Sequence, residues 1–274
     1  MVRLLQQPWK RYRKALKRCR LKSSPEAIHD FRIEIRRLLA SLELLGGLLP
    51  AQRVEKLQRL LKRRLDLFDD LRDTQVQLQT LAHLWHAFPA ARLFRKSLLE
   101  REERFARQAS KEIRKVGTRR LGERIEQCRE HLEERLQGLS SRQAATALLR
   151  PVERAFRRTC ALRALIDPAD STTIHHTRVA FKHFRYMVEA LADNMPAATK
   201  ERLAALRHYQ TMMGDIQDSE VLLAALDKFL RRQSDASPSA RRFRQHLLRH
   251  RQQLIQVYLG AADELLTFWP LPQD

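Results

Sequence analysis

A histidine and several arginines recur at helical spacing in the stretch IHDFRIEIRRLLASLELL, residues 28–45. His29, Arg32 and Arg36 are three and four residues apart, so a helix would place them on one face. Guanidinium groups are planar, charged hydrogen-bond donors that match phosphate oxygens. A protonated histidine also donates to an anion, and a nearby polyanion would favour that form. The pattern indicates an anion-binding site on a helix.

The same pattern occurs again in the stretch TIHHTRVAFKHFRYMVEAL. There, His175, Arg178, Lys182 and Glu189 align with His29, Arg32, Arg36 and Glu43. We expect each glutamate to orient an arginine by pairing with it. A structural alternative stays open, in which the basic side chains only pair with carboxylates of the next helix. The repetition of the whole set favours a binding site.

A second pair of segments follows the first at similar spacing. FDDLRDTQVQLQTL, residues 68–81, matches MGDIQDSEVLLAAL, residues 213–226. Asp73 and Asp218 align and have two candidate roles, as N-caps of the following helices or as partners that hold the basic side chains. The chain is therefore predicted to consist of two homologous halves, residues 1–140 and 141–274.

The elements that carry these residues are predicted to be helices. Gly (7) and Pro (10) are scarce, and no segment alternates like a strand between turn residues. The predicted ranges are 3–20, 25–46, 51–69, 73–88, 90–137 with interruptions near Gly117 and Gly122, 142–166, 172–193, 197–213, 218–232 and 238–267. Breaks are expected at DPADST, DNMP and SDASPS. Ser24 with Pro25, and Ser171 or Thr172, are predicted to begin helices.

Such amphipathic helices with short links pack as bundles. We predict an all-α fold of two antiparallel helical bundles, related by a pseudo-twofold axis, with a basic groove between them. Further basic side chains correspond between the halves and are expected to flank this groove: Arg11 and Lys14 with Arg154 and Arg157, Lys62 with Arg207, and Arg63 with His208.

The charge of the chain indicates its class of partner. Lys and Arg number 53 against 32 Asp and Glu, a net charge of +21. This excess predicts a polyanion as ligand. The three cysteines match no metal motif, and His83 and His86 lack nearby carboxylates, so neither metal nor cofactor is expected. We expect a reduced cytoplasmic location, with no signal peptide and no membrane span.

The doubled H-x-x-R-x-x-x-[RK] stripe, with LRDTQV and IQDSEV about 44 residues further on, resembles the CHAD domain, the conserved histidine α-helical domain. The resemblance covers nearly the whole chain. It implies a pore between the halves, binding of inorganic polyphosphate without catalysis, and association with polyphosphate granules or polyphosphate-metabolising proteins. Carried over by motif, the binding residues are His29, Arg32, Arg36 and Arg37, then His175, Arg178, Lys182 and Arg185, with Lys62 and Arg207. Leu39 departs from the family, which often has an arginine there.

Two other functions remain as alternatives. RNA or DNA also binds basic stripes, although single-strand recognition usually adds exposed aromatic platforms, and aromatic residues make up only 7% of this chain. A histidine phosphotransfer bundle would use a helix-borne histidine, and HDFR resembles a phosphoacceptor sequence. No Thr-Pro follows it, and the chain is longer and more basic than such a domain.

Overall fold

The computed structural model describes residues 1–192, 198–232 and 237–270. Among these residues it contains helices and no strand, which confirms the predicted all-α class. The α-helices are α1 (Arg3–Leu21), α2 (Pro25–Leu44), α3 (Ala51–Asp66), α4 (Asp69–Leu81), α5 (Pro89–Lys115), α6 (Arg119–Gln137), α7 (Ser141–Arg163), α8 (Ser171–Leu191), α9 (Lys200–Leu230) and α10 (Pro238–Ala261). The predicted DNMP break, and the SDASPS break as far as residue 236, lie outside the described residues.

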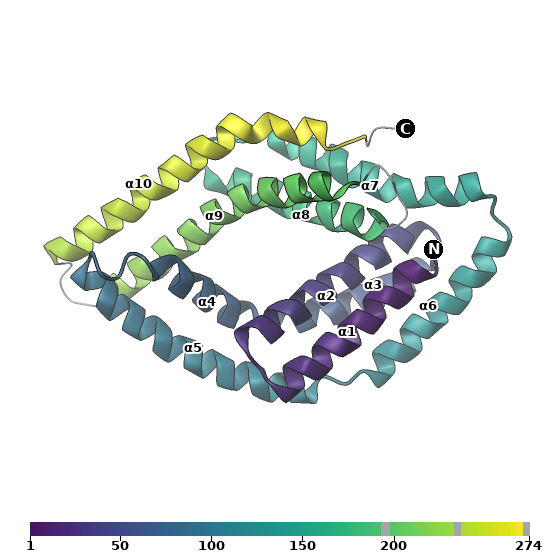
Figure 1. Ribbon diagram of the computed structural model, residues 1–274, viewed down its shortest axis with the longest axis horizontal. Coiled ribbons are helices and arrows are strands. Elements are labelled where there is room, and N and C mark those ends of the chain that lie inside the picture. The colour runs from purple at the N-terminus through teal and green to yellow at the C-terminus, as the bar shows by residue number, and fades with distance from the viewer. Residues whose placement is uncertain (193–197, 233–236, 271–274) are drawn as a thin grey trace.

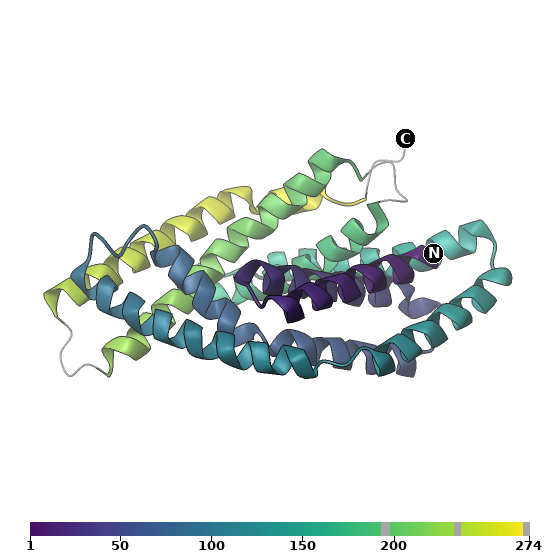
Figure 2. The same ribbon diagram turned by 60° about the horizontal axis from the view of Figure 1, so that its bottom comes forward.

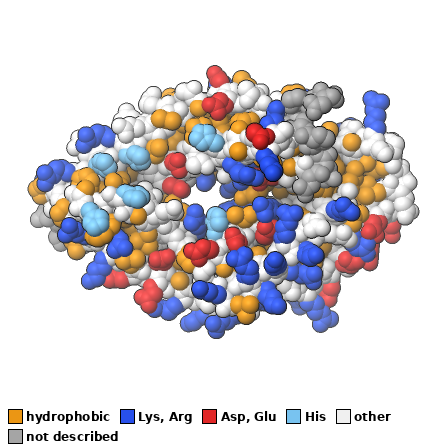
Figure 3. Space-filling model, viewed as in Figure 1, with side chains coloured by type: hydrophobic (Ala, Val, Ile, Leu, Met, Phe, Trp, Pro, Cys, Tyr) orange, Lys and Arg blue, Asp and Glu red, His pale blue; other side chains and the backbone are white. Residues whose placement is uncertain are grey.

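The helices are arranged as an elongated ring (Figures 1 and 2). α2, α4, α8 and α9 form the inner walls, whereas α5, α6 and α10 form the outer edge. The side chains leave an opening near the middle of the molecule, and lysine, arginine, histidine and carboxylate side chains lie on its rim (Figure 3). The ring therefore surrounds an opening with charged walls.

Apolar packing joins the two predicted halves closely. α1 packs on α2, α7 packs on α8, and α2 packs directly on α8. One core contains Phe31 of α2 and Phe181 of α8, both fully buried. A smaller core joins α4 and α5 to α9 and α10, with Phe94 and Phe243 inside it. Both cores take residues from each side of the predicted boundary at residue 140. The duplication itself stays a prediction.

The helix starts agree only partly with the sequence. The hydroxyl of Ser24 accepts a hydrogen bond from the backbone N–H of Ala27, and Pro25 opens α2, as predicted. α8 begins at Ser171, but the N-cap predicted for it, Ser171 or Thr172, is wrong, because the carboxylate of Asp170 caps the helix by accepting from the N–H of Thr172 at 2.9 Å. Aspartate and serine are comparable N-caps, so local sequence leaves two adjacent choices.

α9 corrects a predicted helix break and one predicted N-cap, and α4 corrects a second N-cap. It runs without interruption from residue 200 to residue 230, so Gly214 and Asp218 lie inside it. A glycine costs about 1 kcal/mol in a helix, and the burial of Met213 and Ile216 offsets that cost. Asp73 also lies inside a helix, since α4 already begins at residue 69. Neither aspartate is an N-cap.

Two further boundaries differ from prediction. α4 ends at Leu81 and not at residue 88. The interruption at Gly117 is present between α5 and α6, but Gly122 lies within α6. A Cβ at Gly122 would lie 3.3 Å from the Trp9 ring, so this glycine makes room for the packing of α1 against α6.

Candidate functional site

The structure brings the two basic stripes together, because α2 packs along α8. Arg32 and Arg36 lie one turn apart on α2, as do Arg178 and Lys182 on α8. Burial, and then the positive charges of Arg36 and Arg178, lower the pKa of Lys182 to about 8. The four side chains therefore concentrate positive charge, and we call them the α2–α8 cation cluster.

Arg32 differs from the other members of the cluster because its charge is already paired. Its guanidinium is almost fully buried. It donates to the carbonyl oxygen of Leu65 at 2.8 Å and forms an ion pair with Asp69, also at 2.8 Å. Arg32 thus holds the link between α3 and α4 against α2, which is a structural role beside any role in binding.

Arg36, Arg178 and Lys182 form no ion pair with any described residue. Burial lowers the pKa of Arg36 and of Arg178, and Tyr186 opposes the shift at Arg36 through a hydrogen bond. The Nε of Arg178 is buried without a hydrogen-bond partner among the described residues. Burying positive charges without partners is unfavourable, so these three groups are available to an anion.

A cavity of about 390 Å³ lies beside the cluster, between α2, α3 and α8. Arg36 and Lys182 line it together with Lys62 of α3. Asp69 lines it as well, and so does Glu43. We call it the α2–α3–α8 cavity. It is a polar cavity in which residues from both predicted halves meet.

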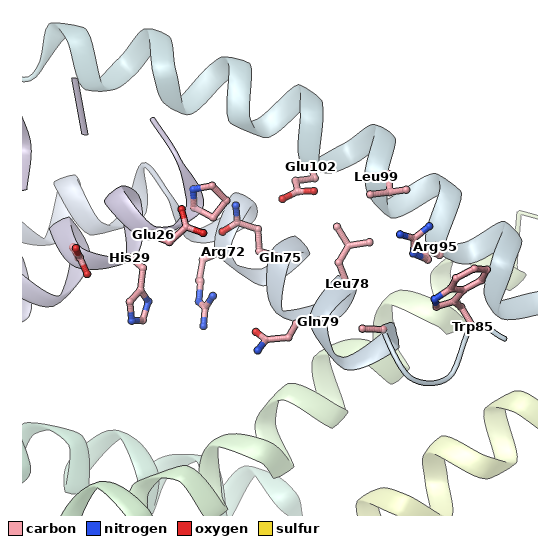
Figure 4. Close-up of a pocket in the computed structure, with 13 residues that line it drawn as sticks. Glu26, His29, Arg72, Gln75, Leu78, Gln79, Trp85, Arg95, Leu99 and Glu102 are labelled. Atoms are coloured by element: carbon pink, nitrogen blue, oxygen red, sulfur yellow. The ribbon is translucent and has the colours of Figure 1, made fainter. Parts of the chain in front are cut away.

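His29 lies where α2 meets α4, at the edge of a second cavity of about 680 Å³. Figure 4 shows His29 and Arg72 pointing the same way, into the open space beside α8 and α9. Burial, and then the charge of Arg72, lower the pKa of His29. The imidazole is therefore mostly neutral at pH 7, and an incoming anion would favour its protonation.

His175 has a matching environment on α8. Its Nδ1 forms a hydrogen bond with the side-chain oxygen of Gln217. Burial lowers the pKa of His175, and Arg178 adds to this shift, while the hydrogen bond with Gln217 opposes it. Both histidines can thus take up a proton when anionic charge arrives.

Asp73 and Asp218 face the cluster from α4 and α9. Burial raises the pKa of both carboxyl groups. Asp218 is the carboxylate that acts most strongly on Arg178, although the two do not form an ion pair. Neither aspartate forms an ion pair with a basic side chain of the cluster, so the second predicted role, in which pairing holds these side chains, stays a prediction.

Several predicted binding residues are paired with carboxylates. Glu189 pairs with Arg185 at 2.7 Å and with Arg207 at 2.9 Å, so it orients arginines as expected. Arg37 pairs with Glu34, and Arg157 pairs with Glu153. The expectation for Glu43 is wrong, because its contact at 3.4 Å is with His183 and not with an arginine.

The remaining predicted residues are dispersed over the surface. Arg11 and Lys14 are exposed on α1, and His208 is exposed on α9. Arg154 and His175 line a cavity of about 660 Å³ between α7 and α8. Arg63 lines a separate cavity between α3 and α6, away from its neighbour Lys62. Arg11, Lys14, Arg63 and His208 do not line the α2–α3–α8 cavity, whereas the cavity between α7 and α8 shares Glu43 and His183 with it.

The sequence analysis missed Asp69, Arg72 and Tyr186. Asp69 pairs with Arg32, Arg72 lies beside His29, and Tyr186 contacts Arg36. Asp69 and Arg72 fall within the repeated segment at residues 68–81, but they align with Gly214 and Gln217, so the repeat gave no signal for them. Tyr186 aligns with Ala40 in the first copy, so the repeat gave no signal for it.

Comparisons with known proteins give a consistent result. The sequence model of the CHAD domain matches residues 3–227. The crystal structure of the CHAD domain from the plant Ricinus communis is 20% identical, with a TM-score of 0.74 over 99% of this chain and 92% of that one. PptA from Streptomyces chartreusis is 16% identical, with a TM-score of 0.65 over 97% of each chain. Both similarities show the fold. No curated protein matches significantly.

Two general features of the described residues complete the description of the site. No group of histidine, cysteine, aspartate and glutamate side chains among them could hold a metal ion. None of their helices combines the length and apolar character that a membrane span requires.

Proposed function

The chain belongs to the CHAD domain family, and from this premise we propose that it binds inorganic polyphosphate at the α2–α8 cation cluster without altering the polymer chemically. One observation carries the proposal: Arg36, Arg178 and Lys182 are partly buried close together and have no ion pair among the described residues. Phosphate oxygens form strong, charge-assisted hydrogen bonds with such groups. Binding would supply the missing negative charge.

The environment of the aromatic side chains favours polyphosphate over nucleic acid. All phenylalanine, tyrosine and tryptophan side chains of this chain are buried or half-buried, and none is exposed. Proteins that bind single-stranded nucleic acid usually stack its bases on exposed aromatic rings. Polyphosphate has no bases, so a site built from charged donors suits it without such platforms.

A direct competition tests this choice of ligand. We expect long-chain polyphosphate to bind at least about tenfold more tightly than single-stranded RNA or duplex DNA, compared at equal ionic strength. The logarithm of the binding constant should fall linearly with the logarithm of salt concentration, as for other polyanions. Fluorescence anisotropy with labelled ligands measures both quantities. Tighter binding of either nucleic acid would contradict the proposal.

Asp69 is expected to weaken binding, since its carboxylate lies in the α2–α3–α8 cavity and neutralises Arg32. The substitution Asp69→Asn keeps a hydrogen-bond acceptor for Arg32 but removes the negative charge. We expect the affinity for polyphosphate to rise about two- to fivefold, because a single partly exposed charge contributes less than about 1 kcal/mol.

The control is Asp66→Asn, which removes another carboxylate that lines the same cavity but forms no ion pair among the described residues. It should give a smaller gain than Asp69→Asn. Titration calorimetry measures both variants. A loss of affinity in Asp69→Asn would mean that the ion pair positions Arg32 for binding.

A further inference from the structure

A second group of cations lies outside the proposed binding site, between α3 and the start of α6. It surrounds a cavity of about 660 Å³, which we call the α3–α6 cavity. Its basic lining residues are Lys56, Arg59, Arg63 and Arg64 on α3, and Arg119, Arg120 and Arg124 on α6. The lining contains no aspartate or glutamate. The walls of this cavity are therefore more uniformly basic than those of the α2–α3–α8 cavity.

The floor of the α3–α6 cavity is fixed by buried contacts. Arg64 is almost fully buried, packs over the ring of Tyr12 and donates to the hydroxyl of that residue. It also donates to the carbonyl oxygen of Gly117 at 2.6 Å. Arg20 donates to the carbonyl oxygen of Val116 in the same link. The link between α5 and α6 is thereby held against α1 and α3.

The rim of the cavity gathers cations that have no carboxylate partner among the described residues. On α5 and α6, Arg107, Lys115 and Arg129 pair with glutamates three or four residues away. In contrast, five rim cations form no ion pair or hydrogen bond with a described residue: Lys56, Arg59, Arg63, Arg120 and Arg124. Arg119 alone on the rim pairs with a glutamate, Glu123. Unpaired like charges in one cavity repel one another, and a polyanion would remove that repulsion.

α3 connects this cavity with the proposed site. Lys62 lines the α2–α3–α8 cavity, whereas Arg59 and Arg63 line the α3–α6 cavity. Arg59 is three positions before Lys62 and four before Arg63, so both are its neighbours on one side of the helix. All three are exposed. A helix with its side chains is only about 10–12 Å wide, so a flexible anionic polymer can pass over α3 from one cavity to the other.

We propose that the α3–α6 cavity is a second binding site for the same polyphosphate chain. A long chain held at the α2–α8 cation cluster crosses α3 at Lys62 and continues into this cavity. A short chain reaches the first site only. Binding would therefore strengthen with chain length. This inference rests on the proposed function and adds a length preference to it.

The test replaces four exposed rim arginines by glutamine, in the variant Arg59→Gln, Arg63→Gln, Arg120→Gln and Arg124→Gln. Arg64 stays, since it holds the fold. We expect the affinity for long-chain polyphosphate to fall about tenfold or more, because several charge-assisted contacts are lost. The affinity for tripolyphosphate should change less than about twofold, a difference within ordinary surface effects. Titration calorimetry measures both ligands.

A matched control removes four exposed arginines elsewhere, in the variant Arg92→Gln, Arg135→Gln, Arg142→Gln and Arg242→Gln. It changes the net charge by the same amount and should lower the affinity for both ligands alike, by less than about threefold. Lysine at the four rim positions keeps the charge and should retain most of the long-chain affinity. Circular dichroism checks that each variant is folded.

The outcomes separate this inference from the proposed function. If the unaltered protein binds neither ligand, the proposed function fails and this inference fails with it. If it prefers the long chain and the rim variant keeps that preference, this inference alone is overturned. Equal losses in the rim variant and its control would also overturn it, since net charge would then explain the effect.

Discussion

Replacing Arg36 and Arg178 together by methionine is expected to lower the affinity for long-chain polyphosphate about 100-fold while the protein stays folded. Both guanidinium groups belong to the α2–α8 cation cluster, and neither forms an ion pair with a described residue. Methionine fills similar space without charge. Removing two half-buried charges that have no ion pair should change thermal stability only slightly, because relief from burying these charges offsets the lost interactions of Tyr186 with Arg36 and of Asp218 with Arg178.

The control for this variant is Arg37→Gln with Arg207→Gln, which removes the same number of charges. Both arginines are already paired with glutamates. Their loss should change polyphosphate affinity less than about threefold, as for surface ion pairs in general. Calorimetric titration gives the affinities, and thermal unfolding gives the stabilities. Unfolding of the Arg36 and Arg178 variant would instead show that the cluster is structural.

Arg32 is deliberately left unchanged in this experiment. The sequence places Arg32 and Arg36 one turn apart and gives no reason to separate them. In the structure, Arg32 pairs with Asp69 and the carbonyl oxygen of Leu65, whereas Arg36 does not pair with a carboxylate. The difference arises from the link between α3 and α4, which reaches α2 only in the folded chain. Helical spacing defines a face, but the partners on the neighbouring helix depend on tertiary packing.

The apolar face of α2 was predictable because it depends on helical spacing alone. Ile28, Phe31 and Ile35 follow the helical period, and all are fully buried. The pairing of Arg185 with Glu189 could also have been predicted, because the two residues are four positions apart on one helix. The contact of Arg207 with the same glutamate could not, since it joins α9 to α8.

The link between the third and fourth predicted helices shows a second limit of prediction from sequence, which concerns where a helix breaks. The two copies align closely here, yet the first copy breaks at residues 67–68 while the second continues through Gly214 as α9. Local preference would place the break at the glycine. In the second copy, the helix keeps Tyr209 and Ile216 buried on either side of it. Packing over a long helix outweighs the small cost of one glycine.

Lys182 is expected to give polyphosphate affinity a distinctive pH dependence. Its pKa is about 8 in the free protein, below the ordinary value of 10.5, because of burial and then of the nearby arginines. A bound polyanion raises this pKa again. Above pH 8, binding must therefore take up a proton, and affinity should fall by up to about tenfold per pH unit. Below pH 8, Lys182 is charged in both states and adds no such dependence.

Lys182 should also make the stability of the ligand-free protein rise with pH, whereas the affinity for polyphosphate falls. Between pH 8 and 10.5 the unfolded chain binds more protons at Lys182 than the folded one. The free energy of unfolding of the ligand-free protein should therefore rise with pH across this range, by up to about 3 kcal/mol. Lys182→Arg keeps the charge and should abolish both trends. If affinity and stability both keep their pH dependence in that variant, another group is responsible. If the pH dependence of affinity and that of stability both disappear in Lys182→Arg, then the one charge of Lys182 destabilises the ligand-free protein and strengthens the binding of polyphosphate.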